Sequence, residues 1–272
     1  MASGGSSGID YAVPGSLTRV GAVVWSAVPK DPVAVCWPVH ELVIQPGEAR
    51  TLGLAEERFA ENQVRPAGRL LETLAALDSA PVDVPPAERR VIGTCRHFAV
   101  LACALLRDRG IAARVRCGFA TYFQPGQGLD HWVVEYDRDG RWVRLDPELL
   151  GGSVVDSPEQ LRPGQFLSGG EAWIAYRQER IDASTFGVYD TDNWGPAEIR
   201  GNAVKDLAAL NKVEMLPWDE WGRMTASYGG RTGPEYDQLI DTVAAVCAAD
   251  DTTAIAALYA SEDLAVPAEL GR

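Results

Sequence analysis

The sequence predicts an α+β fold in which a cysteine-bearing helix packs on an antiparallel sheet. Three patterns support this class. Residues 95–106 carry apolar side chains at helical spacing, and residues 111–119 alternate as in a strand. Residues 131–136 and 141–146 then have the pattern of two strands joined by a tight turn. Helical periodicity returns near the C-terminus, which predicts a helical elaboration of this core.

Composition limits the classes of partner. The chain has 272 residues and a formal net charge of −13, which argues against nucleic acid and anionic membranes as partners. Five cysteines, an odd number without any CxxC pair, argue against a disulfide framework or a zinc site and fit a reduced cytoplasm. We therefore predict a cytoplasmic protein with no cofactor and no bound metal. The first ten residues lack the pattern of a secretory signal and are expected to form a flexible tail.

The predicted organisation is a catalytic core at residues 11–150, followed by a loop-rich and helical elaboration at residues 151–272. The elaboration is expected to pack on the core and line its cleft. Within residues 9–50, three runs broken by Pro and Gly predict strands: 20–28, 33–37 and 41–44. Helices are predicted at 53–63, 67–78, 169–177, 197–211, 236–247 and 253–260, with residues 250–252 capping the last.

Cys95 is the strongest candidate for a nucleophile. It lies in the first turn of the predicted helix, with Thr94 as a plausible N-cap. Unpaired backbone N–H groups and the positive end of the helix dipole favour the thiolate there. Gly93 would let a substrate approach the backbone closely. The other four cysteines lack these features and are expected to be structural: Cys36, Cys103, Cys117 and Cys247.

His131 and Asp146 are the candidate base and orienting acid. A four-residue loop between their strands would place them directly opposite each other, and a two-residue turn at Asp139 and Gly140 would place them diagonally. Both alternatives put the two side chains on one face of the sheet, whereas a three-residue loop would separate them. His97 follows Cys95 by two helical positions and is expected to point away, and His40 is expected to be structural.

At these residues the chain resembles the transglutaminase-like superfamily. The resemblance covers residues 91–149 and rests on GTCRHFAVLACALLRDRGIAARVRCGF, followed by DHWVVEYDRDGRWVRLDPE. It implies a papain-like core with Cys95 as nucleophile, His131 as base and Asp146 as orienting acid. Arg96 stands where animal transglutaminases carry Trp. The RGG-x-C context of arylamine N-acetyltransferases and the CxxC pairs of peptide N-glycanases are not found.

The expected activity is acyl transfer to an amine through a Cys95 thioester, with a small molecule or peptide as acyl donor. Hydrolysis of the same acyl-enzyme by an amidase or peptidase is the alternative, and a non-catalytic binding module is a third. The backbone N–H of Cys95 is expected to serve the oxyanion hole. Candidate substrate-binding residues are Thr94, Trp132, Asp190, Asp192 and Trp194. The segment 189–195 also fits a turn before the next helix, and 217–221 fits either a lid or core packing.

Overall fold

The computed structural model describes residues 8–21, 31–77, 85–261 and 263–270. The predicted N-terminal tail and the predicted strand at 20–28 lie mostly outside these ranges. The chain divides into two compact units. The first, which we call the thiol unit, comprises residues 11–116 and 131–163, and the second, the α6 unit, comprises residues 1–10, 117–130 and 164–272. The expected division of roles at residue 150 remains a prediction.

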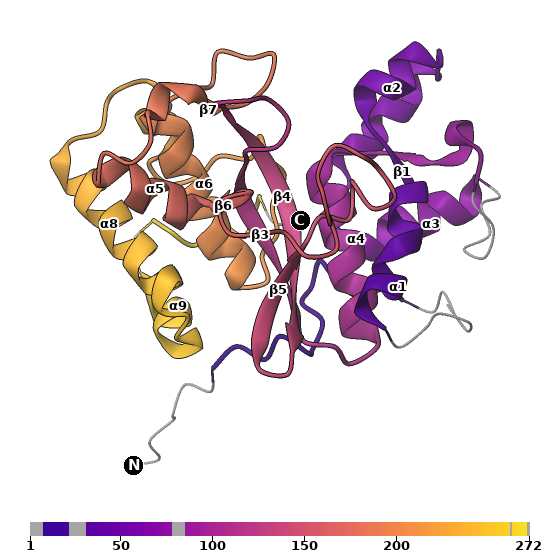
Figure 1. Ribbon diagram of the computed structural model, residues 1–272, viewed down its shortest axis with the longest axis horizontal. Helices are drawn as coiled ribbons and strands as arrows, with labels where there is room; N and C mark the ends of the chain where they lie inside the picture. Colours follow the sequence, from indigo (N-terminus) through magenta and orange to yellow (C-terminus); the bar gives the residue numbers. More distant parts are fainter. Residues whose placement is uncertain (1–7, 22–30, 78–84, 262, 271–272) are drawn as a thin grey trace. The chain divides into compact units, whose positions relative to one another are not determined.

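The architecture combines helices with a mainly antiparallel sheet, so the predicted α+β class is confirmed (Figure 1). The five-stranded sheet has the order β5-β4-β3-β6, and β7 pairs with β4 in the parallel direction. Strands β3 and β4 each contribute residues to both units.

The thiol unit contains α1 Pro32–Cys36, η1 Trp37–Glu41, β1 Val43–Ile44, α2 Pro46–Thr51, η2 Glu56–Gln63, α3 Ala67–Ala76, η3 Ala87–Arg89, β2 Val91–Ile92, α4 Cys95–Asp108, most of β4 Gly128–Arg138, β5 Arg141–Leu145 and the first half of β3 Ala113–Ala120.

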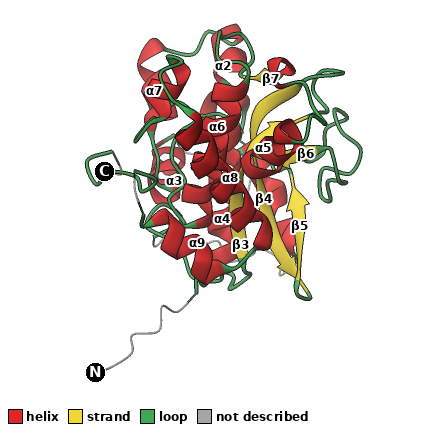
Figure 2. Ribbon diagram, turned by 90° about the vertical axis from the view of Figure 1, so that its left-hand side faces the viewer, coloured by secondary structure: helices red, strands yellow, loops and turns green. Residues whose placement is uncertain are grey.

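The α6 unit is mainly helical (Figure 2). Helices α5, α6 and α8 pack against one another. Asp251 accepts hydrogen bonds from the backbone N–H groups of Thr253 and Ala254, which confirms the predicted cap of the last helix. Its elements are β6 Phe166–Ser168, α5 Gly169–Arg177, η4 Ala183–Thr185, β7 Phe186–Gly187, α6 Pro196–Leu210, α7 Met224–Tyr228, α8 Pro234–Ala249 and α9 Thr252–Tyr259.

The hairpin between β4 and β5 decides which residues can meet. Arg138 pairs with Arg141, so the turn contains only Asp139 and Gly140, with φ angles of 54° and 77°. Two consecutive positive φ angles match the type I′ turn that suits a two-residue hairpin. The two-residue alternative is therefore the one observed, and the ladder ends with Val134 opposite Leu145.

The predicted strand at 33–37 is wrong, because this segment forms helix α1 and the start of η1. Asp31 is the N-cap, and its carboxylate accepts a hydrogen bond of 2.9 Å from the Ala34 N–H. Pro32 occupies the first helical position, where its missing N–H costs nothing. Local capping thus outweighs the β preference of the valines in this short run.

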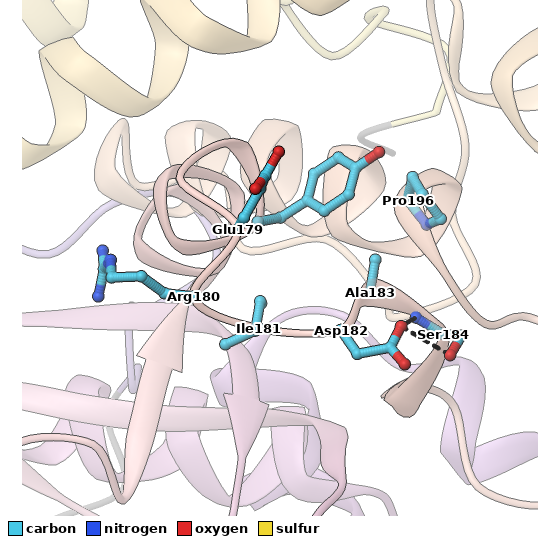
Figure 3. A pocket seen from close by; sticks show the side chains of 8 residues that line it. Glu179, Arg180, Ile181, Asp182, Ala183, Ser184 and Pro196 are labelled. Carbon is cyan, nitrogen blue, oxygen red and sulfur yellow. Dashed lines mark hydrogen bonds between the residues drawn. The ribbon is translucent and has the colours of Figure 1, made fainter.

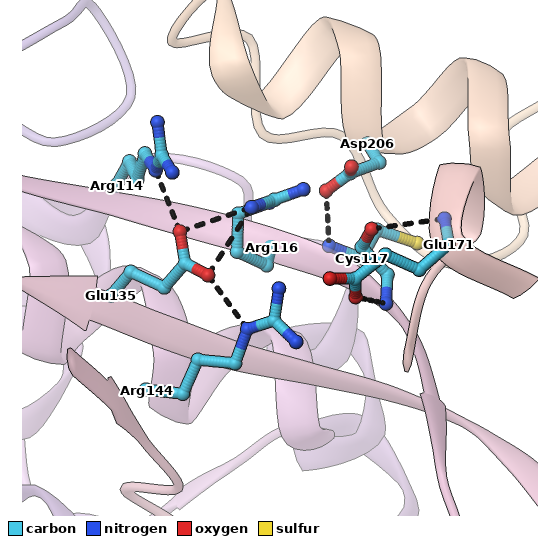
Figure 4. A network of polar contacts seen from close by, with 8 residues as sticks. Arg114, Arg116, Cys117, Glu135, Arg144, Glu171 and Asp206 are labelled. Carbon is cyan, nitrogen blue, oxygen red and sulfur yellow. Dashed lines mark hydrogen bonds and ion pairs between the residues drawn. The ribbon is translucent and has the colours of Figure 1, made fainter. Parts of the chain in front are cut away.

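Strand β3 also differs from the expected half-buried strand, because its charged face is covered as well. Arg114 and Arg116 are 4% and 5% exposed, and both form ion pairs with Glu135 on β4 (Figure 4). Arg144 on β5 completes the group with a contact of 2.7 Å to the same carboxylate, and Arg114 also stacks on Trp142. Three cations hold the pKa of Glu135 far below its usual value despite its burial.

No helix in the described segments is both long enough and apolar enough to cross a membrane.

Candidate active site

Helix α4 begins at Cys95, as predicted, with Thr94 as its N-cap residue. The Thr94 N–H donates a hydrogen bond of 3.0 Å to Nδ1 of His97, which takes the place of Glu or Gln in a capping box. Burial and the neighbouring Arg96 lower the pKa of His97 to about 3, so its ring stays neutral and serves the helix start. A role for His97 in capping, not in catalysis, agrees with its expected orientation.

The structure gives a steric reason for glycine at position 93, which the sequence alone did not reveal. A Cβ atom at this position would lie 2.7 Å from Cγ of the His97 ring, well inside contact distance. Glycine is therefore needed so that the capping histidine can pack against the backbone before the helix. The expected role of Gly93 in substrate approach stays a prediction.

His131 and Asp146 meet as the diagonal pairing requires. Nε2 of His131 lies 2.8 Å from Oδ2 of Asp146, and the two residues are 2% and 0% exposed. Burial of the ring would lower its pKa, but the Asp146 carboxylate and the Cys95 sulfur raise it, and the pKa of His131 lies well above its usual value. The carboxylate thereby favours the imidazolium and fixes which ring nitrogen carries the hydrogen bond.

Cys95 lies next to this pair. Its sulfur is within 4.8 Å of a ring nitrogen of His131 and of a carboxylate oxygen of Glu148. Because Nε2 of His131 faces Asp146, Nδ1 is the nitrogen available to the thiol. The order is thiol, imidazole, carboxylate, and all three groups belong to the thiol unit. This arrangement can form a thiolate–imidazolium pair and transfer a proton to a leaving group.

Glu148 is the residue that the sequence analysis missed. Its Oε1 accepts a hydrogen bond of 2.7 Å from the Gln45 side chain, whereas Oε2 is buried with no hydrogen-bond partner among the described residues. Burial raises the pKa of Glu148 to about 7, with His131 opposing the shift and Asp146 adding to it. The sequence signal that could have identified Glu148 as a site residue was its spacing, since it follows Asp146 by two residues.

The backbone of Glu148 is held in place from two directions. Its N–H donates to Oδ1 of Asp146 at 3.0 Å, and its carbonyl accepts from Nδ1 of His40 at 2.6 Å. The expected structural role of His40 therefore takes the form of an anchor for the segment after β5. Both contacts hold the segment in which the Glu148 side chain lies near the Cys95 sulfur.

The five predicted substrate-binding residues fall into both units. Thr94 is part of the helix cap, and the fully buried ring of Trp132 belongs to the core. Asp190, Asp192 and Trp194 lie in the α6 unit, in a turn before α6. There the Trp194 indole N–H donates to the Thr191 carbonyl at 3.0 Å, which agrees with the turn alternative for this segment. Contacts of these residues with a substrate stay predictions.

The two aromatic residues of segment 217–221 differ. Trp221 is 5% exposed and its indole N–H donates to the Leu264 carbonyl, whereas Trp218 is 42% exposed. The second tryptophan thus packs in the core, and the first is available at the surface.

The remaining cysteines are buried, as Cys95 is, and the structural role expected for them stays a prediction. Burial raises the pKa of the Cys36 thiol, and of the Cys117 thiol, well above the usual value. Cys117 donates its S–H to Oδ1 of Asn202 at 3.4 Å, and its backbone N–H donates to Asp206 (Figure 4). The raised pKa, caused by burial and then by the Asp130 carboxylate, keeps the Cys117 thiol protonated.

A surface depression of about 570 Å³ lies in the α6 unit (Figure 3). Asp182 at its edge accepts hydrogen bonds from the backbone and hydroxyl of Ser184. No cysteine or histidine is among the residues that line it: Tyr176, Glu179, Arg180, Ile181, Asp182, Ala183, Ser184 and Pro196. This depression therefore offers no thiol paired with an imidazole.

Comparison with known proteins supports the resemblance at the level of the superfamily. Residues 72–147 match the model of the Transglutaminase-like superfamily, and the matched segment contains Cys95, His131 and Asp146. The resemblance predicted from the sequence is thereby confirmed. The match and the α+β fold together support a cysteine-based enzyme at the level of the superfamily.

Among solved structures, the chain is similar to a candidate cysteine protease from Cytophaga hutchinsonii. The identity is 21% and the TM-score is 0.20, and the alignment covers 50% of this chain and 48% of that one. The chain thus spans about half the length of this protein, and a likeness at this level does not bear on activity. No curated protein matches the chain.

Proposed function

We propose that the chain is a cysteine-dependent acyltransferase that forms or exchanges an amide bond through a thioester at Cys95. The observation that carries the proposal is the buried sequence of contacts from the Cys95 sulfur through His131 to Asp146. A cysteine with a purely structural role does not need a histidine beside its sulfur, and a helix cap does not need one either. Here His131 faces the Cys95 thiol on one side and is held by the Asp146 carboxylate on the other. The acyl donor is proposed to be a small molecule or a peptide.

In the first half-reaction, the Cys95 thiolate attacks the acyl carbonyl and a tetrahedral adduct forms. His131 gives the proton on Nδ1 to the leaving group as the carbon–leaving group bond breaks. The helix N-terminus supplies the Cys95 N–H as one donor to the developing oxyanion. Neutral His131 then removes a proton from the incoming amine, the amine attacks the thioester, and the sulfur leaves as thiolate.

Transfer requires that the amine reaches the thioester before water does. Water is present at about 55 M, so the site must hold the amine in position and exclude water. Positioning of this kind can lower the activation barrier by several kcal/mol. The burial of the reacting groups supports such exclusion, since Cys95 is 8% and His131 2% exposed. A site open to bulk water would favour the hydrolase alternative.

The test is to load the enzyme with an activated acyl donor and then add candidate amines. Transfer predicts that an amide product forms and that the acyl-enzyme decays faster as the amine concentration rises. Decay at one rate with and without every amine, with no amide product, would favour the amidase or peptidase. Cys95→Ala is expected to abolish either activity, and activity that survives this substitution would overturn the role of Cys95.

A further inference from the structure

The unpartnered carboxylate oxygen of Glu148 requires an explanation of its own. A buried acceptor without a hydrogen bond costs about 1–3 kcal/mol, and such atoms in folded proteins commonly mark a place for an ion or water. A carboxylate oxygen of Glu148 lies within 4.8 Å of the Cys95 sulfur and of a ring nitrogen of His131, and Oε2 has no hydrogen-bond partner among the described residues. The proposed acyl transfer uses three other groups and leaves Glu148 without a task. Its position is also one residue beyond the segment that matches the superfamily model.

We propose that Cys95, His131 and Glu148 form a binding site for a thiophilic divalent cation such as Zn²⁺, which blocks the nucleophile reversibly. One sulfur, one imidazole nitrogen and one carboxylate oxygen are the ligand types that Zn²⁺ takes in proteins. Their ligating atoms all lie within 4.8 Å of one another. Ligands of a tetrahedral zinc ion are roughly 3.3–3.8 Å apart, so a small closure of the side chains brings them into place.

Groups behind the three ligands support the same assignment. Nε2 of His131 faces Asp146 at 2.8 Å, which directs Nδ1 to the site. A carboxylate behind a ligating histidine is the common outer contact of protein metal sites, because it fixes the ring and increases its basicity. Gln45 plays the corresponding part for Glu148, since its amide donates to Oε1 at 2.7 Å and leaves Oε2 without a hydrogen bond among the described residues.

The ligand set also indicates selectivity. Sulfur and imidazole ligands favour Zn²⁺ over Mg²⁺ and Ca²⁺, which prefer sites made of oxygen atoms. Three protein ligands leave one position of a tetrahedral ion for water or substrate. A cation at this place occupies the Cys95 sulfur and the nitrogen of His131 that transfers protons, so binding and catalysis exclude each other.

The experiment measures Zn²⁺ binding directly on the full chain by competition with a chromogenic chelator. One equivalent is expected to bind, and Glu148→Gln is expected to weaken binding more than about tenfold, since loss of an outer contact alone costs about 10- to 100-fold. Glu198→Gln is the matched control, because Glu198 is a buried glutamate of the α6 unit and its replacement should leave the affinity unchanged. Far-UV circular dichroism confirms that each variant is folded.

A second measurement separates this site from adventitious binding elsewhere. Zn²⁺ is expected to protect Cys95 from iodoacetamide in the wild type and to do so only at higher concentration in Glu148→Gln, while Mg²⁺ and Ca²⁺ give no protection. Equal Zn²⁺ affinity of the wild type and Glu148→Gln would overturn the proposal, as would unchanged affinity in Cys95→Ala. Binding is measured without turnover, so the result does not depend on whether the acyltransferase proposal holds.

Discussion

The two units each bury a cysteine among polar groups, and the two surroundings differ in one respect that governs reactivity. In the thiol unit, Cys95 faces a histidine that a carboxylate holds in place. In the α6 unit, the Cys117 thiol donates a hydrogen bond to the side-chain amide oxygen of Asn202, which is not a base and cannot remove the thiol proton. A base next to the sulfur creates a nucleophile, and an amide at the same place creates a structural hydrogen bond.

The buried glutamates of the two units repeat this contrast. Burial raises the pKa to about 7 for Glu148 and also to about 7 for Glu198. Glu198 accepts a hydrogen bond of 2.8 Å from the Tyr228 hydroxyl, whereas Oε2 of Glu148 has no hydrogen-bond partner within the described ranges. The similar pKa values of Glu148 and Glu198 therefore do not imply that the two glutamates have similar roles. The unsatisfied oxygen distinguishes Glu148, the residue of the proposed cation site, from Glu198.

The largest expected effect is the difference in turnover between variants of Asp146, which contacts His131 beside Cys95, and of Asp206, which contacts Cys117. Asp146→Asn should lower turnover by about 10,000-fold, because an amide no longer fixes the tautomer of His131 or stabilises the imidazolium. Asp206→Asn keeps an oxygen for the Cys117 N–H and should leave turnover within a few-fold of wild type. Steady-state kinetics on both folded variants measures the difference, and equal losses would show that Asp146 has no special role.

The next effect concerns the cysteines themselves. Cys95 should react with iodoacetamide at neutral pH at least about 100-fold faster than Cys117, since the buried Cys117 thiol keeps its proton and becomes accessible only when the structure opens. Peptide mass mapping after limiting reaction gives both rates in one sample. Labelling of Cys117 at a rate similar to that of Cys95 would remove the contrast between the two units.

A smaller effect is expected on stability, and it tests the structural role of the hydrogen bonds around Cys117. Asn202 donates to the Gly118 carbonyl at 3.3 Å and to Asp130 at 2.8 Å, and accepts from Cys117. Asn202→Ala should therefore lower the free energy of unfolding by about 1–3 kcal/mol, because it leaves buried groups unpaired. Urea unfolding is the measurement. Glu148→Gln is the companion variant and should change stability less, since Oε2 of Glu148 has no hydrogen bond to any residue that the structure describes.

The last effect, of similar size, concerns His97, the capping histidine two residues after Cys95. The pKa of His97 is about 3 in the folded chain against an ordinary value of 6.5, so between these values the unfolded chain binds one more proton. Its contribution to stability is thus present above pH 6.5 and is lost as pH falls, by about 1.4 kcal/mol per pH unit. His97→Gln keeps a capping acceptor and removes the titration.

The measurement is the difference in unfolding free energy between wild type and His97→Gln from pH 6.5 to pH 4.5. Taking this difference cancels the other titrating groups, including Glu148 and Glu198, whose raised pKa values act in the opposite direction. The advantage of the wild type should shrink as the solution is acidified. A constant difference across this range would show that His97 is not held neutral in the folded chain.

The sequence predicted most of what local pattern determines. Apolar spacing located helix α4, and alternation with a turn located strands β4 and β5. The run at 33–37 was assigned to a strand because its valines favour β structure, and it formed a helix because Asp31 and Pro32 supply a helix start. Propensity is a weak signal in a run of five residues, and a single cap can reverse it.

By itself the sequence determined that Cys95, His131 and Asp146 could share one site, because the helix start and the period of two along a strand follow from local chemistry. Only the tertiary structure decided between the opposite and diagonal pairings, since the turn at Asp139 and Gly140 sets the register. It also decided that Gln45 and His40, about a hundred residues earlier, hold Glu148 at the thiol. Contacts over such distances leave no periodic trace in a single sequence, because they depend on how separate elements pack.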